Sequence, residues 1–221
     1  YTRSIQIRDN SEVIRYSKDP KPMSKKDYFN DRTDFLKKIV QPNSVLLIDG
    51  PLIGGDYYTE MIKHIDDFID KNIALIFFVK NSESNLVTDN LNSLINKYNS
   101  DLHWAYSYLK PGERTNFFKY IVRGTTSGNN AMIFFYYKGF DVSPQRIEFP
   151  LQVFDNYHEN IDEFMDMIHY FILANGDLSN PQVRPIAVAE KYARASLRLF
   201  DIQTMIRKSV LTPTMNQERF G

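Results

Sequence analysis

Continuous apolar runs and amphipathic stretches alternate along the chain and predict an α/β protein. Residues 44–49 read SVLLID, four consecutive aliphatic residues that end at Asp49 and Gly50, and this pattern is typical of a buried central strand that stops at a turn. Residues 57–71 have the periodicity of an amphipathic helix, and residues 73–79 form a second apolar run. A strand, a helix and another strand in succession indicate a sheet covered by helices.

The remaining elements fit the same class. Residues 27–40 are expected to form a helix with Asp31, Phe35 and Ile39 on one face at spacings of four residues, whereas Asp34 points away. The other predicted elements are a hairpin at 4–8 and 13–16, a polar helix at 85–98, an aromatic-rich strand at 104–109, a strand at 131–137 paired with 146–149, and helices at 161–174 and 188–208.

The composition narrows the possible functions. Because 27 basic residues balance 27 acidic ones, the chain lacks the overall positive charge typical of many nucleic-acid-binding proteins, although a local basic groove is compatible with a neutral total. The absence of cysteine excludes disulfides and thiolate–zinc sites and suits a cytoplasmic protein. No apolar run is long enough to predict a transmembrane helix. The chain begins with Tyr1 rather than Met, so we expect further sequence upstream.

Asp49 is the strongest candidate for a catalytic or metal-binding residue. A carboxylate at the C-terminal end of a central strand faces the crevice in which open α/β sheets bind ligands. Such carboxylates hold Mg²⁺ or Mn²⁺, and these ions can polarise a phosphodiester and activate water. The plainer interpretation is that Asp49 and Gly50 form an ordinary turn after the strand.

Three arginines are candidates for binding a DNA backbone. Arg114 belongs to the sequence PGERT, which either grips a phosphate or is simply a Pro-Gly turn with solvated charges. Arg146 and Glu148 share the face of a strand opposite their apolar neighbours, where they either line a groove or simply pair with each other on an exposed face. Arg184 precedes Pro185 near the start of a helical region with basic character, whose plainer interpretation is a solvated face.

The order of these motifs resembles the NurA nuclease family. The blocks VLLIDGPLIGG, IALIFFVKNSESNLV, LKPGERTNFF, IFFYYKG, SPQRIEFP and NPQVRPIAVAEKYARA follow one another between residues 27 and 195. The resemblance implies an RNase H-like mixed sheet flanked by helices, a homodimer, and docking on a HerA-type hexameric ATPase to trim DNA ends with Mn²⁺ or Mg²⁺.

The resemblance also assigns residues one by one. Asp49 matches the family's second metal-binding Asp, and the acidic residue of the preceding helix falls near Asp31, with Asp34 as the alternative. In its last motif the family has a Tyr before Pro and a His further along the helix, where this chain has Arg184 and Tyr192. The family's first metal-binding Asp lies in an Asp-Gly-Ser segment that this chain does not contain, so we expect it in the upstream sequence.

These observations lead to one main hypothesis and two alternatives. The main hypothesis is that residues 1–221 form a single NurA-like domain that lacks its N-terminal part and acts as a metal-dependent DNA nuclease. Its catalytic residues would be Asp49, Asp31 and Tyr192, the first two holding the metal, while the three arginines track the DNA. Alternatively, the chain is a catalytically weakened DNA clamp and adaptor for the ATPase, or an α/β domain in which Asp49 is only a turn residue.

Overall fold

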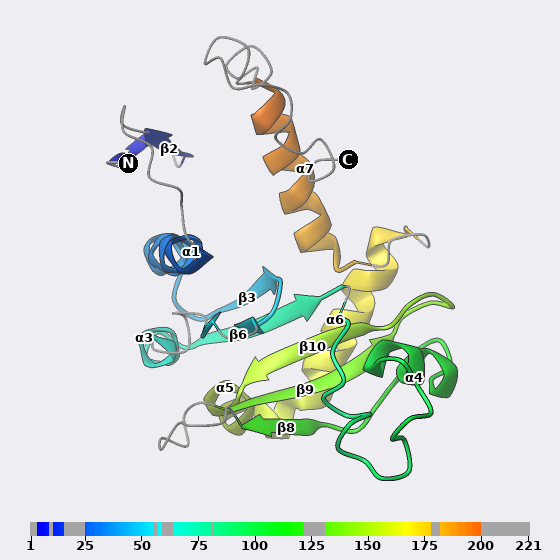
Figure 1. Ribbon diagram of the computed structural model, residues 1–221. Coiled ribbons are helices and arrows are strands. Elements are labelled where there is room, and N and C mark those ends of the chain that lie inside the picture. The colour runs from blue at the N-terminus through cyan, green and yellow to red at the C-terminus, as the bar shows by residue number, and fades with distance from the viewer. Residues whose placement is uncertain are drawn as a thin grey trace. The chain divides into compact units, whose positions relative to one another are not determined.

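The chain forms two compact units. The computed structural model describes residues 4–8, 11–15, 25–54, 57–58, 64–80, 82–121, 131–177 and 182–199 (Figure 1). The first unit comprises Tyr1–Ser44 and Leu52–Ile73, and the second comprises Val45–Pro51 and Ala74–Gly221. Each unit is described separately below, and the predicted single domain over residues 1–221 stays a prediction.

The first unit contains a long helix and short elements around it. The first two strands pair as an antiparallel hairpin, as the sequence predicted. An ion pair of 2.7 Å joins Lys37 Nζ in the long helix to Asp67 Oδ2 in a shorter one. The described elements are β1 (Ser4–Arg8), β2 (Ser11–Arg15), α1 (Lys25–Ile39), β4 (Ile53–Gly54), β5 (Tyr57–Tyr58) and α3 (Ile65–Ile69).

The second unit is built on a six-stranded mixed sheet. Its strands are β3 (Ser44–Asp49), β6 (Ile73–Val79), β7 (Glu113–Arg114), β8 (Phe118–Ile121), β9 (Ala131–Lys138) and β10 (Gln145–Pro150). The strand order is β3-β6-β10-β9-β7, and β8 also pairs with β9. The strands β3 and β6 run in the same direction, whereas β10 is antiparallel to both β6 and β9 (Figure 1). This arrangement confirms the predicted α/β class with a mixed sheet; its finer assignment as RNase H-like stays a prediction.

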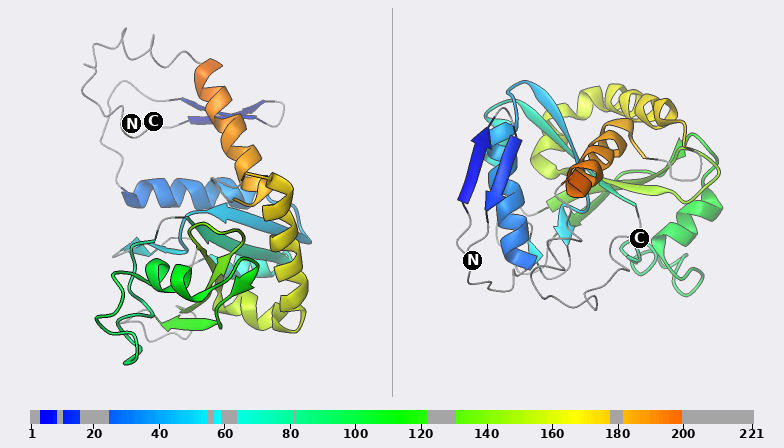
Figure 2. Two further views of the ribbon diagram at one scale, coloured as in Figure 1. Left: turned by 90° about the vertical axis from the view of Figure 1, so that its right-hand side faces the viewer. Right: turned by 90° about the horizontal axis from the view of Figure 1, so that it is seen from above.

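Helices cover both faces of this sheet. One face packs against α5 and α6 and the other against α4, as the two side views show (Figures 1 and 2). Successive residues of β9 point to opposite faces, so Phe135 meets Phe149 and through it Phe164 of α6, whereas Tyr136 meets Trp104 of α4. The helices are α4 (Asp101–Tyr108), α5 (Leu151–Tyr157), α6 (Ile161–Asn175) and α7 (Arg184–Leu199), with a 3₁₀ turn η1 (His158–Asn160).

Two predictions between residues 85 and 109 are wrong. Residues 85–98 form turns rather than a helix, partly because the Asp101 carboxylate accepts hydrogen bonds from the backbone N–H groups of Val87 and Thr88. Residues 104–109 belong largely to helix α4 rather than to a strand. The Ser100 hydroxyl accepts a hydrogen bond from the His103 N–H and caps this helix, so capping outweighs the strand preference of the aromatic residues.

The remaining predictions are mostly confirmed. The expected helices at 27–40 and 161–174 correspond to α1 and α6, and the strands at 44–49, 73–79, 131–137 and 146–149 to β3, β6, β9 and β10. The helix expected at 57–71 is wrong at residues 57–58, which form a strand, while α3 covers Ile65–Ile69 and residues 59–63 lie outside the described part. The last helix begins at Arg184, four residues before its predicted start, and residues 200–208 lie outside the described part.

Candidate functional site

Asp49 stands where β3 ends and the chain turns away from the sheet. Gly50 follows it with φ of 100°, a conformation that favours glycine, and its N–H donates to the Phe78 carbonyl of β6 over 2.8 Å. The side chain of Asp49 is 45% exposed. Asp49 and Gly50 therefore make the turn that the plainer interpretation describes, and the turn leaves the carboxylate open to solvent at the strand end. The role of Asp49 as a metal ligand stays a prediction.

Lys80 lies next to Asp49 because β3 and β6 end at the same edge of the sheet. It is the first residue after β6, and its Nζ lies 3.4 Å from Asp49 Oδ2. The same Nζ donates a hydrogen bond of 2.6 Å to Glu190 Oε1 on helix α7. One ammonium group thus joins two carboxylates that come from a strand and from a distant helix.

The two carboxyl groups have opposite pKa shifts. Burial raises the pKa of Asp49, Lys80 lowers it in part, and a hydrogen bond donated to Glu190 raises it again. The hydrogen bond from Lys80 lowers the pKa of Glu190. In this structure Asp49 is therefore the carboxyl group that more readily holds a proton, and Glu190 is the carboxylate that accepts from it.

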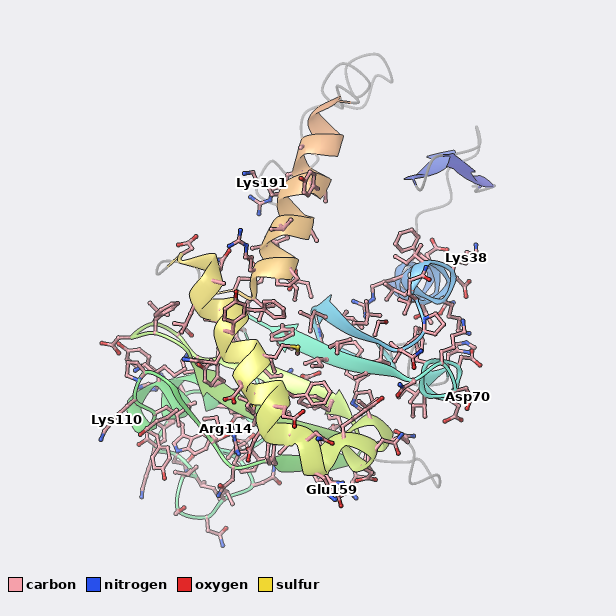
Figure 3. The ribbon with its side chains drawn as sticks, turned by 180° about the vertical axis from the view of Figure 1, so that it is seen from behind. Lys38, Asp70, Lys110, Arg114, Glu159 and Lys191 are labelled. Carbon is pink, nitrogen blue, oxygen red and sulfur yellow. The ribbon has the colours of Figure 1, made fainter. Side chains whose placement is uncertain are left out.

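An apolar pocket next to Asp49 accounts for the desolvation. It has a volume of about 480 Å³ and lies between β3, α6 and α7, the helix on which Lys191 is labelled in Figure 3. Its walls are mainly aliphatic and aromatic, whereas Asp49 and Glu190 are the two acidic side chains that line it. The apolar residues that line it most directly from the three elements are Val45, Leu47, Met167, Phe171, Ile186 and Ala189.

Helix α7 does not bring Tyr192 to this cluster. Ile186 is 4% exposed and stands one turn before Glu190, so these two residues mark the helix face that packs on the unit. Tyr192 is 72% exposed and follows Glu190 by two residues, which is a rotation of about 200° around the helix. Arg184, at the helix start, donates from Nη1 to the Ala174 carbonyl of α6 over 3.0 Å.

Arg114 and Asp49 lie at opposite ends of the strand order of the sheet. It belongs to β7, which is four strands away from β3 in the sheet order, or roughly 19 Å at the usual spacing of about 4.8 Å. Its Nη1 donates to the Thr115 carbonyl, and its guanidinium stacks over the Phe117 ring at 4.3 Å from the ring centroid. Figure 3 labels Arg114 well apart from Lys191 of α7.

Arg146 is buried in the second unit. It lies with Glu148 on the face of β10 opposite Ile147, as predicted, but helix α4 and the preceding turns cover that face. The Arg146 Nε donates to Glu148 over 2.7 Å, and Nη1 donates to the hydroxyls of Ser82 and Ser84. The predicted pairing with Glu148 is therefore present, but the expectation of an exposed face is wrong, because both side chains are buried.

Asp31 belongs to the first unit and Asp49 to the second, so each is described within its own unit. Asp31 is partly buried on α1, whereas Asp34 is exposed, as the predicted apolar stripe requires. Among the residues that the structure describes, no group of three or more His, Cys, Asp or Glu side chains could hold a metal ion. The carboxylates of Asp49 and Glu190 nevertheless provide the hard oxygen ligands that Mg²⁺ and Mn²⁺ prefer.

The sequence analysis missed Lys80 and Glu190. A signal for Lys80 was present, since it directly follows the second buried strand, just as Asp49 ends the first. For Glu190 the signal was its spacing of four residues from Ile186, which puts it on the apolar face of the helix. Attention to the motif position of Tyr192 obscured that spacing.

Comparison with known proteins supplies a family. A family model described as a NurA domain matches residues 2–194, most of the chain. Comparison with curated proteins and with solved structures finds no match. None of the helices in the described segments combines the length and apolar character needed to cross a membrane.

Proposed function

Because the chain belongs to the NurA domain family of nucleases, we propose that it is a metal-dependent DNA nuclease with Asp49 in its active site. The observation that carries the proposal is the position of Asp49: a half-exposed carboxylate at a strand end, next to a second carboxylate.

The cofactor in this proposal is Mn²⁺ or Mg²⁺. Asp49 would hold the ion, and the resemblance to the family implies Asp31 as a further ligand. A bound divalent cation would polarise the phosphodiester and favour its attack by water. The protein's own contribution is to fix Asp49 at the end of a strand, so that the carboxylate loses little freedom when the cation binds.

The proposal extends to DNA and to protein partners. Arg184 is exposed next to α7 and is placed to meet a phosphate from the solvent side, while Arg114 is half-buried and Arg146 is buried. We therefore rank Arg184 first among the three proposed DNA-binding arginines. A homodimer that processes DNA ends with a HerA-type hexameric ATPase is the assembly implied by the resemblance to the family.

Tyr192 favours a second candidate function. It stands where the family has a His, and a phenol with a reference pKa near 10 is a poor base at neutral pH. A catalytically weakened NurA-like clamp that holds DNA for the ATPase would fit this replacement. Cleavage of DNA by the unaltered chain with Mn²⁺ decides between the two functions.

Asp49→Asn tests the proposed active site. The substitution keeps the shape of the side chain but removes the charge, so Mn²⁺-dependent cleavage of DNA should fall by at least about 100-fold, the scale of losing a main charge-stabilising group. The melting temperature of the metal-free protein should stay nearly unchanged, because Asp49 is half-exposed. Cleavage at the parental rate would place the active site elsewhere.

A further inference from the structure

The side chain that α7 directs at Asp49 belongs to Glu190. Ala189 and Glu190 follow Ile186 by three and four residues, so the three share one side of the helix, and all three line the pocket beside β3. Tyr192, which stands where the family motif has a His, points to a different side of the helix and is largely exposed. Geometry and motif position therefore single out different residues of the same helix.

The surroundings of Glu190 hold its carboxylate in place. Lys80 Nζ lies 2.6 Å from its Oε1, and the buried Gln182, which is 2% exposed, also helps to lower the pKa of Glu190. The Glu190 side chain is 32% exposed, so one part of it is fixed by the protein while another part remains accessible to solvent. A carboxylate of this kind is oriented before any ligand arrives.

The cluster of Asp49, Lys80 and Glu190 requires positive charge between its two carboxyl groups. Lys80 Nζ lies 3.4 Å from Asp49 Oδ2 and 2.6 Å from Glu190 Oε1, so one ammonium group offsets the mutual repulsion of the two carboxylates. A divalent cation would bring twice the charge of Lys80 and would allow both groups to be ionised together. The arrangement is suited to a cation, because its two carboxylates are already gathered around one positive charge.

We propose that Glu190 is the carboxylate that helix α7 supplies to the divalent-cation site of Asp49, and that Lys80 is the counter-charge holding the pair together without the cation. This inference rests on the proposed function, which it deepens by naming a metal ligand two residues from the position that the family motif indicates. Tyr192 is then a residue of the outer surface of α7 and does not bind the metal.

Direct measurement of Mn²⁺ binding tests the assignment without relying on activity. Isothermal titration of the 221-residue chain should show that Glu190→Gln weakens Mn²⁺ binding by about tenfold or more, since the affinity of such sites follows the number of charged oxygen ligands. The matched control is Glu159→Gln, the same change at an exposed residue of the 3₁₀ turn η1, labelled in Figure 3, and it should bind Mn²⁺ as the parent does. Unchanged affinity in Glu190→Gln would overturn the inference.

Lys80→Met provides the opposite test. Removing the ammonium group should lower the melting temperature of the metal-free protein, because the two carboxyl groups lose their counter-charge. It should also tighten Mn²⁺ binding and increase the rise in melting temperature that Mn²⁺ causes. Weaker Mn²⁺ binding in Lys80→Met would show that Lys80 supports the metal site instead of substituting for the cation, and would overturn the second half of the proposal.

One further variant and one comparison between variants distinguish failure of the nuclease function from failure of the Glu190 assignment. If Glu190→Gln does not fold, Glu190→Asp retains the charge with a shorter reach and should still weaken Mn²⁺ binding relative to the parent. If Asp49→Asn abolishes cleavage while Glu190→Gln keeps both cleavage and Mn²⁺ affinity, the nuclease function stands and the role of Glu190 is refuted. If the parent binds Mn²⁺ through Glu190 but never cleaves DNA, the nuclease function fails and the metal assignment stands.

Discussion

At the scale of single residues, neighbours on one helix have separate tasks. Glu190 faces Asp49 and a buried pocket, whereas Tyr192 is exposed to solvent only two residues later. A helix repeats every 3.6 residues, so such a pair cannot serve the same cluster of side chains. In the proposed nuclease, Tyr192 is therefore placed to contact DNA from the surface, and its hydroxyl would donate a hydrogen bond to a phosphate oxygen.

Tyr192→Phe should weaken cleavage only modestly. The loss of one hydrogen bond costs about 0.5–1.5 kcal/mol, which corresponds to a roughly 2- to 12-fold lower kcat/KM for DNA. Tyr192→His should be tolerated, because the exposed site accepts an imidazole without repacking. The measurement is steady-state cleavage with Mn²⁺ together with Mn²⁺ affinity. Complete loss of cleavage in Tyr192→Phe with metal binding intact would mean that the hydroxyl takes part in the chemistry.

At the scale of secondary structure, a buried polar network explains why residues 85–98 are not helical. Asp101 is fully buried at the start of α4 and accepts hydrogen bonds from the Val87 and Thr88 backbone N–H groups and from the Tyr136 hydroxyl. These bonds satisfy backbone groups that a helix would otherwise use within itself. The turns at 85–98 and helix α4 are thus parts of one hydrogen-bonded assembly on the sheet.

Asp101→Asn should destabilise the second unit by about 3 kcal/mol, because an amide cannot accept all the hydrogen bonds that both carboxylate oxygens receive. Tyr136→Phe removes one of these bonds and should cost about 1.5 kcal/mol. Urea unfolding followed by circular dichroism measures both. Equal losses in the two variants would show that the backbone hydrogen bonds to Asp101 contribute little.

The same network shows which elements could be predicted from the sequence. Strands β3 and β6 were predictable because continuous aliphatic runs have few other structures available to them. The region from 85 to 109 was not, since its structure depends on Asp101 meeting Tyr136, which is 35 residues away in the sequence. In the candidate site, the position of Asp49 could be predicted because the residue ends a buried strand. Its pairing with Glu190 could not be predicted, because it depends on the docking of α7.

At the scale of the whole molecule, the neutral total charge has to be reconciled with a DNA substrate. The chain carries 27 basic and 27 acidic residues, so any attraction to DNA must come from local groups or from an assembly. A dimer that encloses DNA on a hexameric ATPase would hold its substrate by geometry as well as by charge. For the dimer interface we propose the apolar residues of the last helix and tail, Leu199, Phe200, Ile206 and Phe220, the last three of which lie outside the described residues.

Light scattering tests the assembly at this scale. At micromolar concentration the chain should have the mass of a dimer, about twice its own 25.9 kDa, and it should co-elute with a HerA-type ATPase in size-exclusion chromatography. Raising the salt concentration should weaken DNA binding less than it does for a strongly basic protein, since few phosphates are neutralised. A monomer that does not co-elute with the ATPase would refute the proposed assembly.

The hydrogen bond between Lys80 and Glu190 spans 110 residues of sequence and has a consequence for biosynthesis. During translation the sheet strands β3 and β6 emerge long before α7, so Asp49 and Lys80 can pair while Glu190 is still to be made. Until residue 190 has left the ribosome and α7 has docked, a nascent chain can offer a divalent cation at most one of the two carboxylates. In the proposed nuclease, the order of synthesis would therefore delay loading of the divalent cation until helix α7 has docked.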